Sequence, residues 1–190
     1  MPEADRTLFT RRTLIVAIAL IVAFAALMYL LDRPAWCDEG FGLVTGAATG
    51  CTSQHLLDPY TLSHILHGVI FYWMLRPLAG KFSLAQRMIG ALIVEIGWEV
   101  IENSPWVIER YRQHTAALGY VGDSMVNSLA DVVATMVGFA FASRFSWKAS
   151  VALFIVFELW MLYTARDNLT LNVLMLFFPI EAIKEWQLAA

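Results

Sequence analysis

The chain has 190 residues, of which 59% are hydrophobic and 15% are charged, and its formal net charge at pH 7 is -3. Soluble domains are on average about 45–50% apolar and about 25% charged, so this composition indicates a polytopic membrane protein. The small negative charge and the lack of a basic patch exclude an electrostatic nucleic-acid binder. No long polar stretch could fold as a second unit, so we expect residues 1–190 to form one integral membrane domain.

The first apolar run covers residues 13–31 and is long enough to cross about 30 Å of hydrocarbon. A cleaved signal peptide would have an apolar core of roughly 7–15 residues, followed by a cleavage site with small residues. Here the run is followed by Leu-Leu-Asp-Arg-Pro-Ala-Trp, which does not fit such a site. We therefore interpret the run as a retained membrane anchor.

Further apolar runs predict four more spans, at residues 61–78, 84–102, 123–143 and 149–165. The last apolar run, 169–183, is short and contains Pro179. We interpret it as a tilted or short sixth span, with a re-entrant segment and an interfacial helix as alternatives. The predicted fold is therefore an all-α transmembrane bundle of five or six spans.

The placement of Lys and Arg predicts the orientation, because cytoplasmic loops carry an excess of both. Eight basic residues fall before the first span or in the turns at 76–87 and 144–148, against four in the opposite loops. The N-terminus is therefore predicted to be cytoplasmic, and the loop at 32–60 lies on the outer side. That loop contains Cys37 and Cys51, for which a disulfide and two unpaired thiols both remain open.

Ionisable and amide side chains recur toward the outer ends of four predicted spans. Three glutamates at i, i+4 and i+7 share one helix face, and two aspartates and an asparagine at i, i+4 and i+8 share a face of the next helix. Ionisable groups at bilayer depth cost about 2.5–3.5 kcal/mol each on insertion scales, so they usually face a bundle interior and mark a functional site. The expected site residues are His64, His67, Glu95, Glu99, Asp123, Asn127, Asp131 and Arg166.

His64 and His67 lie about one turn apart on a single helix face. Neutral imidazole and carboxylate are ligands of zinc, iron and manganese. Proteins with di-metal sites in four-helix bundles likewise bring inward-facing Glu and His together from several helices. The two histidines are therefore candidate ligands of a divalent metal. The alternative is a hydrogen-bonded network without metal, because the His-x-x-His spacing is common by chance.

Glu99 and Asp123 are the candidate catalytic residues. Glutamates that share one helix face repel one another unless they are protonated, paired or metal-bound, and such crowded carboxylates suit general acid/base catalysis. The alternative is a structural network that holds the helix ends together, and Glu102 could simply be solvated. The expected binding residues are Asn127, Glu95, Asp131 and Arg166.

Other features of the sequence carry less chemistry. Gly90, Gly97 and Gly138 lie within predicted spans and are expected to permit close helix packing. The sequence contains no Gly-x-Ser-x-Gly elbow, no phosphate-binding glycine loop and no His-Glu-x-x-His motif. The enzyme classes that depend on those motifs are therefore not predicted.

Three stretches resemble a family of uncharacterised bacterial inner-membrane proteins, namely LSHILHGVIFYWMLRPL, EIGWEVIENSPWVIERYRQHT and YVGDSMVNSLADVVATMVGF. The resemblance covers most of the chain. Its most specific strings are Trp-Glu-x-x-Glu-Asn and Gly-Asp-Ser-x-x-Asn-Ser-x-x-Asp. The resemblance implies a multi-pass protein of the bacterial inner (plasma) membrane with no assigned activity.

A more distant similarity is to VanZ-like membrane proteins. Their pattern is a His early in one span, Glu-x-x-Gln ending another, and Asp-x-x-x-Asn opening the next. In this chain His67, Glu99 and the pair Asp123 and Asn127 would occupy those places. Glu102 stands where Gln is usual, which is one departure from the pattern.

Together these features predict an inner-membrane protein with a polar His/Glu/Asp/Asn site on the outer, periplasmic side. The first hypothesis is a metal-assisted hydrolase or transferase that acts on a lipid or envelope precursor. The second is a non-catalytic protein that binds or carries a cation, a proton or a polar head group. The third is a structural subunit whose polar network holds the bundle together. The expected partners are the lipid bilayer and the lipid or envelope precursor, with no nucleic acid.

Overall fold

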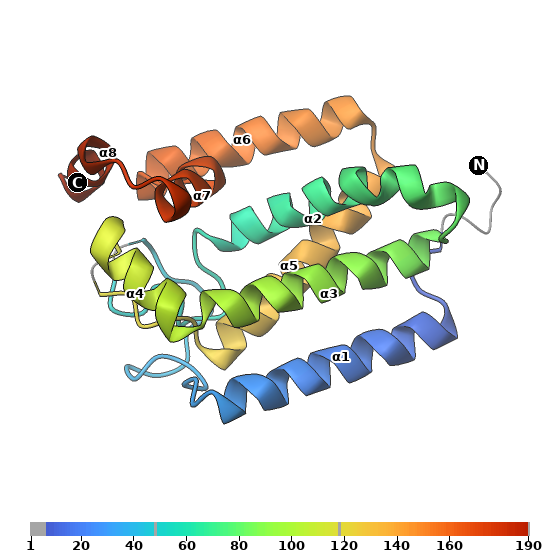
Figure 1. The fold of residues 1–190 in the computed structure, drawn as a ribbon, viewed down its shortest axis with the longest axis horizontal. Helices are drawn as coiled ribbons and strands as arrows, with labels where there is room; N and C mark the ends of the chain where they lie inside the picture. Colours follow the sequence, from blue (N-terminus) through green and yellow to red (C-terminus); the bar gives the residue numbers. More distant parts are fainter. Residues whose placement is uncertain (1–6, 48, 118, 190) are drawn as a thin grey trace.

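The computed structural model describes residues 7–47, 49–117 and 119–189, and within these ranges every regular element is a helix. The predicted all-α class is therefore confirmed. Five long helices run side by side along the long axis of the molecule (Figure 1). They are α1 (Arg11–Leu30), α2 (Thr61–Leu75, continued by the 3₁₀ helix η2, Arg76–Gly80), α3 (Leu84–Glu102), α5 (Met125–Arg144) and α6 (Trp147–Ala165).

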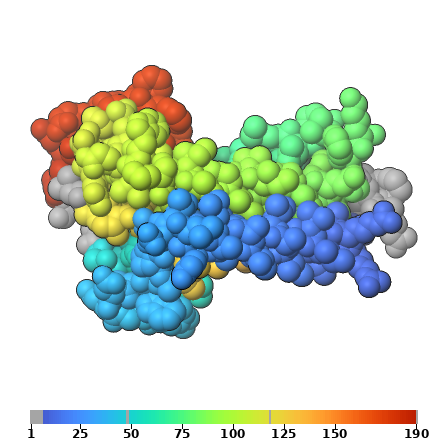
Figure 2. All heavy atoms as spheres, turned by 60° about the horizontal axis from the view of Figure 1, so that its bottom comes forward, coloured from blue at the N-terminus to red at the C-terminus, as the bar shows by residue number. Residues whose placement is uncertain are grey.

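Three short helices gather at one end of this bundle, which is also where the loop at 31–60 lies (Figures 1 and 2). These helices are α4 (Pro105–His114), α7 (Leu169–Phe177) and α8 (Glu181–Leu188). The turns between α2 and α3 and between α5 and α6 lie at the opposite end (Figure 1). The two ends of the bundle therefore differ, with compact turns at one and a thick layer of loops and short helices at the other.

Most of the helices begin at a hydroxyl residue that caps the first turn. Ser83 and Gln86 form a reciprocal capping box at the start of α3. Ser104, Ser124 and Ser146 each accept a hydrogen bond from a backbone N–H in the first turn of α4, α5 and α6. These caps satisfy N–H groups that have no partner inside the helix, so the helix boundaries follow the serines in the sequence.

By length and apolar composition, α1, α5 and α6 could each cross a membrane. α1 and α6 expose large apolar side chains, among them Ile15, Val22, Ile155 and Leu159. α3 has a similar length but carries several ionisable residues, and α2 reaches a similar length only together with η2. The composition of the long helices therefore indicates membrane association.

The segment expected as a sixth span does not form one helix. α7 ends at Phe177 and α8 begins at Glu181, with Pro179 between them. Proline has no backbone N–H and clashes with the preceding turn, so it separates the two helices. The 9 residues of α7 rise only about 14 Å, less than half of a hydrocarbon core of about 30 Å.

The closest helix contact joins α2 to α5. A Cβ atom added at Gly68 would overlap the carbonyl oxygen of Thr135, and one added at Gly138 would overlap the carbonyl oxygen of Ile65. The hydroxyl of Thr135 donates to the carbonyl oxygen of His64 at 2.9 Å. The two backbones therefore touch at a pair of glycines, as in small-residue contacts between membrane helices.

The expectation of close packing is correct for Gly138 and wrong for Gly90 and Gly97. A Cβ at Gly90 would meet only Leu75, at 3.7 Å, and a Cβ at Gly97 would meet nothing within 4 Å. The second glycine of the real contact, Gly68, lies in the middle of an apolar run, where nothing in the sequence marks it as special.

We expect Gly68→Ala to lower the free energy of unfolding by about 1–3 kcal/mol, because the added methyl group must displace the backbone of α5. Thermal unfolding of the detergent-purified protein, followed by circular dichroism, would measure the loss. Gly97→Ala is the matched control and should leave stability unchanged or slightly higher, since Ala favours helices. An equal loss in both variants would contradict the close contact at Gly68.

Candidate functional site

A cavity of about 540 Å³ lies at the end of the bundle that holds the short helices. The ends of α2, α3 and α5, the short helices and two loops all contribute to its wall. Its histidines and carboxylic acids are Asp58, His64, His67, Glu102, Asp123, Asp131 and Asp167. In the ranges that the structure describes, no Lys or Arg side chain lines it. We call this cavity the acidic chamber.

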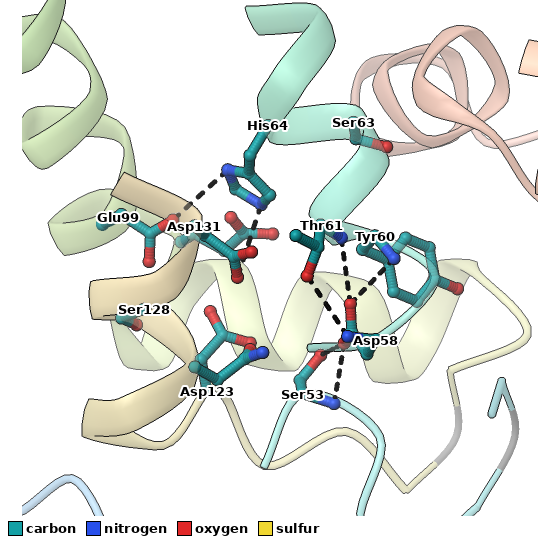
Figure 3. Close-up of polar contacts among 12 residues, drawn as sticks. Ser53, Asp58, Tyr60, Thr61, Ser63, His64, Glu99, Asp123, Ser128 and Asp131 are labelled. Carbon is teal, nitrogen blue, oxygen red and sulfur yellow. Dashed lines mark hydrogen bonds and ion pairs between the residues drawn. The ribbon is translucent and has the colours of Figure 1, made fainter. Parts of the chain in front are cut away.

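His64 lies between carboxylates from two other helices. Its Nδ1 atom is 2.5 Å from Oε1 of Glu95 and 3.5 Å from Oε1 of Glu99, both on α3. Its Nε2 atom is 3.8 Å from Oδ2 of Asp131 on α5. Figure 3 shows His64 with its ring directed at Glu99 and Asp131. All four side chains are buried, so one imidazole links three helices.

His67 adds a second imidazole one turn along α2. Its Nδ1 atom is 3.2 Å from Oε2 of Glu95, and its ring stacks on Phe71 and meets the edge of Trp98. His64, His67 and Glu95 offer three ligand atoms that all lie within 4.8 Å of one another. A second group with the same property consists of His64, Glu99 and Glu102. The two predicted metal ligands and the predicted carboxylates therefore meet at one place.

Two of the buried carboxylates have oxygens that receive no hydrogen bond. Among the described residues, nothing donates to either oxygen of Glu99 or to Oδ1 of Asp131. Glu99 is 0% exposed and Asp131 is 3% exposed. Burying an ionised carboxylate costs several kcal/mol unless a partner compensates its charge. The arrangement is therefore suited to taking up a cation or protons beside His64.

Three further carboxylates of the acidic chamber each accept a hydrogen bond from a tyrosine. Burial and neighbouring carboxylates raise the pKa of all three tyrosines well above the usual 10, so the phenols stay protonated and donate. We refer to these three contacts as the phenol–carboxylate pairs. They are Tyr111 with Glu102 at 3.3 Å, Tyr120 with Asp123 at 3.0 Å and Tyr60 with Asp167 at 3.3 Å. The hydroxyl of Tyr111 is shared with Oδ1 of Asn172, which lies at 2.8 Å.

Burial also changes the acidity of two carboxyl groups in these pairs. Loss of solvation raises the pKa of Asp167 to about 6, although the hydrogen bonds that it accepts oppose the change. Burial, and then the charge of Asp58, raises the pKa of Asp123, while donors from Asn103 and Tyr120 lower it. Asp167 is therefore mostly ionised at pH 7 and takes up a proton in mildly acidic solution.

Asn103 is a site residue that the sequence did not reveal. Its Oδ1 atom accepts from the backbone N–H of Asp123 at 2.7 Å, and its Nδ2 atom donates to Oδ2 of Asp123 at 3.0 Å. The same Nδ2 atom donates to the carbonyl oxygen of Glu99 at 3.0 Å. An asparagine at the end of a helix is an ordinary C-cap signal, so its contact with a residue 20 positions later could not be read from the sequence.

Asp58 lines the acidic chamber, yet its carboxylate serves the backbone. Oδ1 accepts from the N–H groups of Tyr60 and Thr61, and Oδ2 accepts from the N–H of Ser53 (Figure 3). Glu158 on α6 has a similar role, because its two oxygens accept from the first two N–H groups of α7. These two carboxylates therefore stabilise the first turns of α2 and α7.

Three further residues discussed from the sequence are Asn127, Arg166 and Glu102, and they differ in how they relate to the acidic chamber. Asn127 lines the acidic chamber and donates to the carbonyl oxygen of His55 at 2.9 Å, so it holds the loop before α2. Arg166 lies outside the lining, where it donates to the carbonyl oxygen of Trp186 and stacks on that ring. Glu102, for which solvation was left open as an alternative, is partly buried, lines the acidic chamber and accepts from Tyr111.

The loop at 31–60 forms part of the wall and is fixed at several points. Cys37 and Cys51 form a disulfide, which decides between the two alternatives left open by the sequence. Arg33 donates through Nε to the carbonyl oxygen of Asp123 at 3.0 Å. The backbone N–H of Ser124 donates to the carbonyl oxygen of Ser53 at 2.9 Å. These bonds tie the loop to the start of α5.

Residues 28–189 match a family model described as a protein of unknown function (DUF2585). A UPF0314 protein of Brucella anthropi is 44% identical over 91% of this chain and 89% of its own length. A UPF0314 protein of Rhizobium etli strain CIAT 652 is 47% identical over 91% of this chain and 90% of its own length. A UPF0314 protein of Paracoccus denitrificans is 43% identical over 98% of this chain and 98% of its own length. No solved structure gives a significant match. The predicted resemblance to an uncharacterised family is confirmed, and the similarity to VanZ-like proteins stays a prediction.

We expect Asn103→Leu to lower the free energy of unfolding by about 1–3 kcal/mol, because it leaves the N–H and a carboxylate oxygen of Asp123 buried without a partner. Chemical denaturation in detergent would measure the loss. Gln113→Leu is the control, because among the described residues this exposed amide bonds only the side chain of Glu109, and it should change stability by less than about 0.5 kcal/mol. A neutral Asn103→Leu would contradict the positioning role of Asn103.

Proposed function

The chain belongs to the DUF2585 family, whose function is unknown, and we propose that it is a multi-pass membrane protein that binds a divalent metal in its acidic chamber. The metal serves hydrolysis or group transfer on a lipid or envelope precursor. The donor set carries this proposal, because His64, His67 and Glu95 offer ligand atoms within 4.8 Å of one another. Imidazole nitrogen and carboxylate oxygen are the ligands that zinc, iron and manganese take in proteins.

Charge balance supports a cation at the same place. Glu95, Glu99 and Asp131 surround His64, and the carboxylate of Glu99 receives no hydrogen bond from the described residues. No Lys or Arg side chain of the described chain lines the acidic chamber, so the imidazoles are its only basic side chains. A divalent ion would compensate charge that the protein itself leaves unbalanced.

A metal held there would polarise a carbonyl or phosphoryl oxygen and activate a bound water. Glu99 lies 3.5 Å from His64 and is the candidate general base, because nothing in the described chain donates to it. Asp123, His64 and His67 line the acidic chamber. Asp123 is fixed by Asn103 and Tyr120, which suits a group that orients a substrate or transfers a proton.

The proposed topology has five spans, formed by α1, α2 with η2, α3, α5 and α6, and a cytoplasmic N-terminus. The disulfide Cys37–Cys51 supports this orientation, because such bonds persist in oxidising compartments and this one lies at the chamber end. The opposite end carries Arg11, Arg12, Arg76, Lys81, Arg87, Arg144 and Lys148, as expected for a cytoplasmic face. In a bacterial inner membrane, the acidic chamber then opens toward the periplasm.

A second candidate is a non-catalytic site for a proton or a cation. The distance of 2.5 Å between Nδ1 of His64 and Oε1 of Glu95 is a hydrogen-bond distance, which favours a network that works without metal. In that case the same residues take up and release a proton, and the acidic chamber binds a cation or carries it without a reaction.

We expect detergent-purified protein to contain about one equivalent of zinc, iron or manganese, and the double variant His64→Ala/His67→Ala to lose it, because the variant removes both imidazole ligands. Elemental analysis of both preparations would measure the metal. His114→Ala is the control, since His114 does not line the acidic chamber, and it should keep the metal. Wild-type protein that is free of metal, and stays so after incubation with these ions, would contradict the metal proposal and favour the proton network.

We expect Glu99→Gln to lower metal affinity by at least tenfold while leaving the stability of the metal-free protein unchanged or higher. The reason is that an amide removes a charge that nothing in the described chain compensates by hydrogen bonding. Metal titration followed by tryptophan fluorescence and unfolding of the metal-free form would measure the two effects. A loss of stability without a loss of affinity would instead indicate a structural role for Glu99.

A further inference from the structure

We propose that the acidic chamber binds an organic cation through a primary ammonium group, which the three phenol–carboxylate pairs hold. This inference names the substrate class for the proposed function and rests on the acidic chamber being the working site. Its phenol–carboxylate pairs are separate from the His64, His67 and Glu95 donor set, whereas Asp131 also faces His64, since its Oδ2 atom is 3.8 Å from Nε2 of His64.

The size of the acidic chamber exceeds the need of a metal ion. Its volume is about 540 Å³, and pockets for small molecules have volumes of about 300–1,000 Å³. The phenol–carboxylate pairs come from the end of α3, from α4, from the loop before α5, from the start of α2 and from the junction between α6 and α7. The cavity therefore has room and polar groups for an organic ligand beside the metal ligands.

Several carboxylates of the acidic chamber accept fewer hydrogen bonds than they can. A carboxylate can accept about four hydrogen bonds, whereas among the described residues Glu102 accepts one from Tyr111, and Asp123 accepts one from Tyr120 and one from Asn103. Asp131 lines the same cavity, is 3% exposed, and has an Oδ1 atom to which none of the described residues donates. A buried oxygen without a donor, on the wall of a cavity, indicates a ligand that supplies N–H groups.

A primary ammonium group is the ligand chemistry that fits this wall. It has three N–H donors, one positive charge and no acceptor. Lining aromatic rings add cation–π attraction, and the rings of Tyr111 and Tyr120 meet edge to face at 5.4 Å. A free phosphate or carboxylate ligand would instead meet several like charges without a Lys or Arg from the described chain to offset them.

Three apolar residues line the cavity, and two of them reach the surface. Trp98, Val173 and Leu188 line the acidic chamber from α3, α7 and α8. Val173 is 41% exposed and Leu188 is 46% exposed, so the wall continues to the outside of the protein there. An ammonium group on a membrane amphiphile could enter past these residues with its chain left outside, and a soluble amine is the other source of the same chemistry.

Binding of matched amine and alcohol probes to detergent-purified wild-type protein tests the inference. The soluble pair is ethanolamine and ethylene glycol, and the amphiphilic pair is dodecylamine and dodecanol, each titrated by microscale thermophoresis in one detergent. We expect at least one amine to bind saturably, at least tenfold more tightly than its alcohol. Binding of dodecylamine alone identifies a membrane amphiphile, and equal binding of ethanolamine identifies a soluble amine. Amines that bind no better than their alcohols would overturn the proposal.

Two variants test the residues. Asp167→Asn and Asp123→Asn should each weaken amine binding by at least tenfold, because each removes one negative charge and keeps the size of the side chain. Glu109→Gln removes a negative charge outside the acidic chamber, where the side chain of Glu109 is 55% exposed, and should leave affinity unchanged. Affinity that is unchanged in both aspartate variants would refute the role of the phenol–carboxylate pairs. Unfolding curves identify any variant that does not fold, and the wild-type probe pairs remain decisive in that case.

Metal content measured on the same preparations separates this inference from the proposed metal site. Protein that binds metal but shows no preference for amines keeps the metal proposal and overturns the ammonium proposal. Protein that binds amines without any metal keeps the ammonium proposal and overturns the metal proposal.

Discussion

His64 can reach carboxylates on both α3 and α5 only because α2 lies in backbone contact with α5. Gly68 and Gly138 allow this approach, and the bond from Thr135 to the carbonyl oxygen of His64 fixes the register of the two helices. Any larger residue at either glycine would separate the helices and change the place of the imidazole relative to Asp131. The chemistry of the acidic chamber therefore depends on a contact that itself contains no ionisable group.

At the end of the bundle that holds the acidic chamber, loops and short helices form a covering layer. This layer is held by a disulfide and hydrogen bonds of its own. The disulfide Cys37–Cys51 shortens the free loop, and Asp58 holds the first turn of α2 through the N–H groups of Tyr60 and Thr61. Glu158 holds the start of α7 in the same way. Backbone polar groups in such a layer need partners, because an unpaired buried N–H or C=O costs about as much as a lost hydrogen bond. The covering loops can therefore remain ordered over a polar cavity.

The helices and the inner part of the site could be predicted from the sequence because both depend on local spacing. Apolar runs predicted the five long helices, and the spacing of Glu95, Glu99 and Asp131 put them on inward faces. The apolar composition of residues 169–183 predicted one short span and did not reveal two short helices, although Pro179 marked the break between them.

One phenol–carboxylate pair, Tyr60 with Asp167, and the place of Arg166 depend on which distant segments meet. Tyr60 contacts Asp167 across 107 positions of the chain, and Tyr111 contacts Asn172 across 61. Hydrogen bonds then separate two kinds of buried carboxylate. Asp58 and Glu158 accept hydrogen bonds from backbone N–H groups on both oxygens and maintain the fold, whereas Glu99 receives no hydrogen bond from the described residues. A protein retains a buried acceptor of this second kind at a cost in stability, and that cost is offset only when a cation or a proton occupies the site.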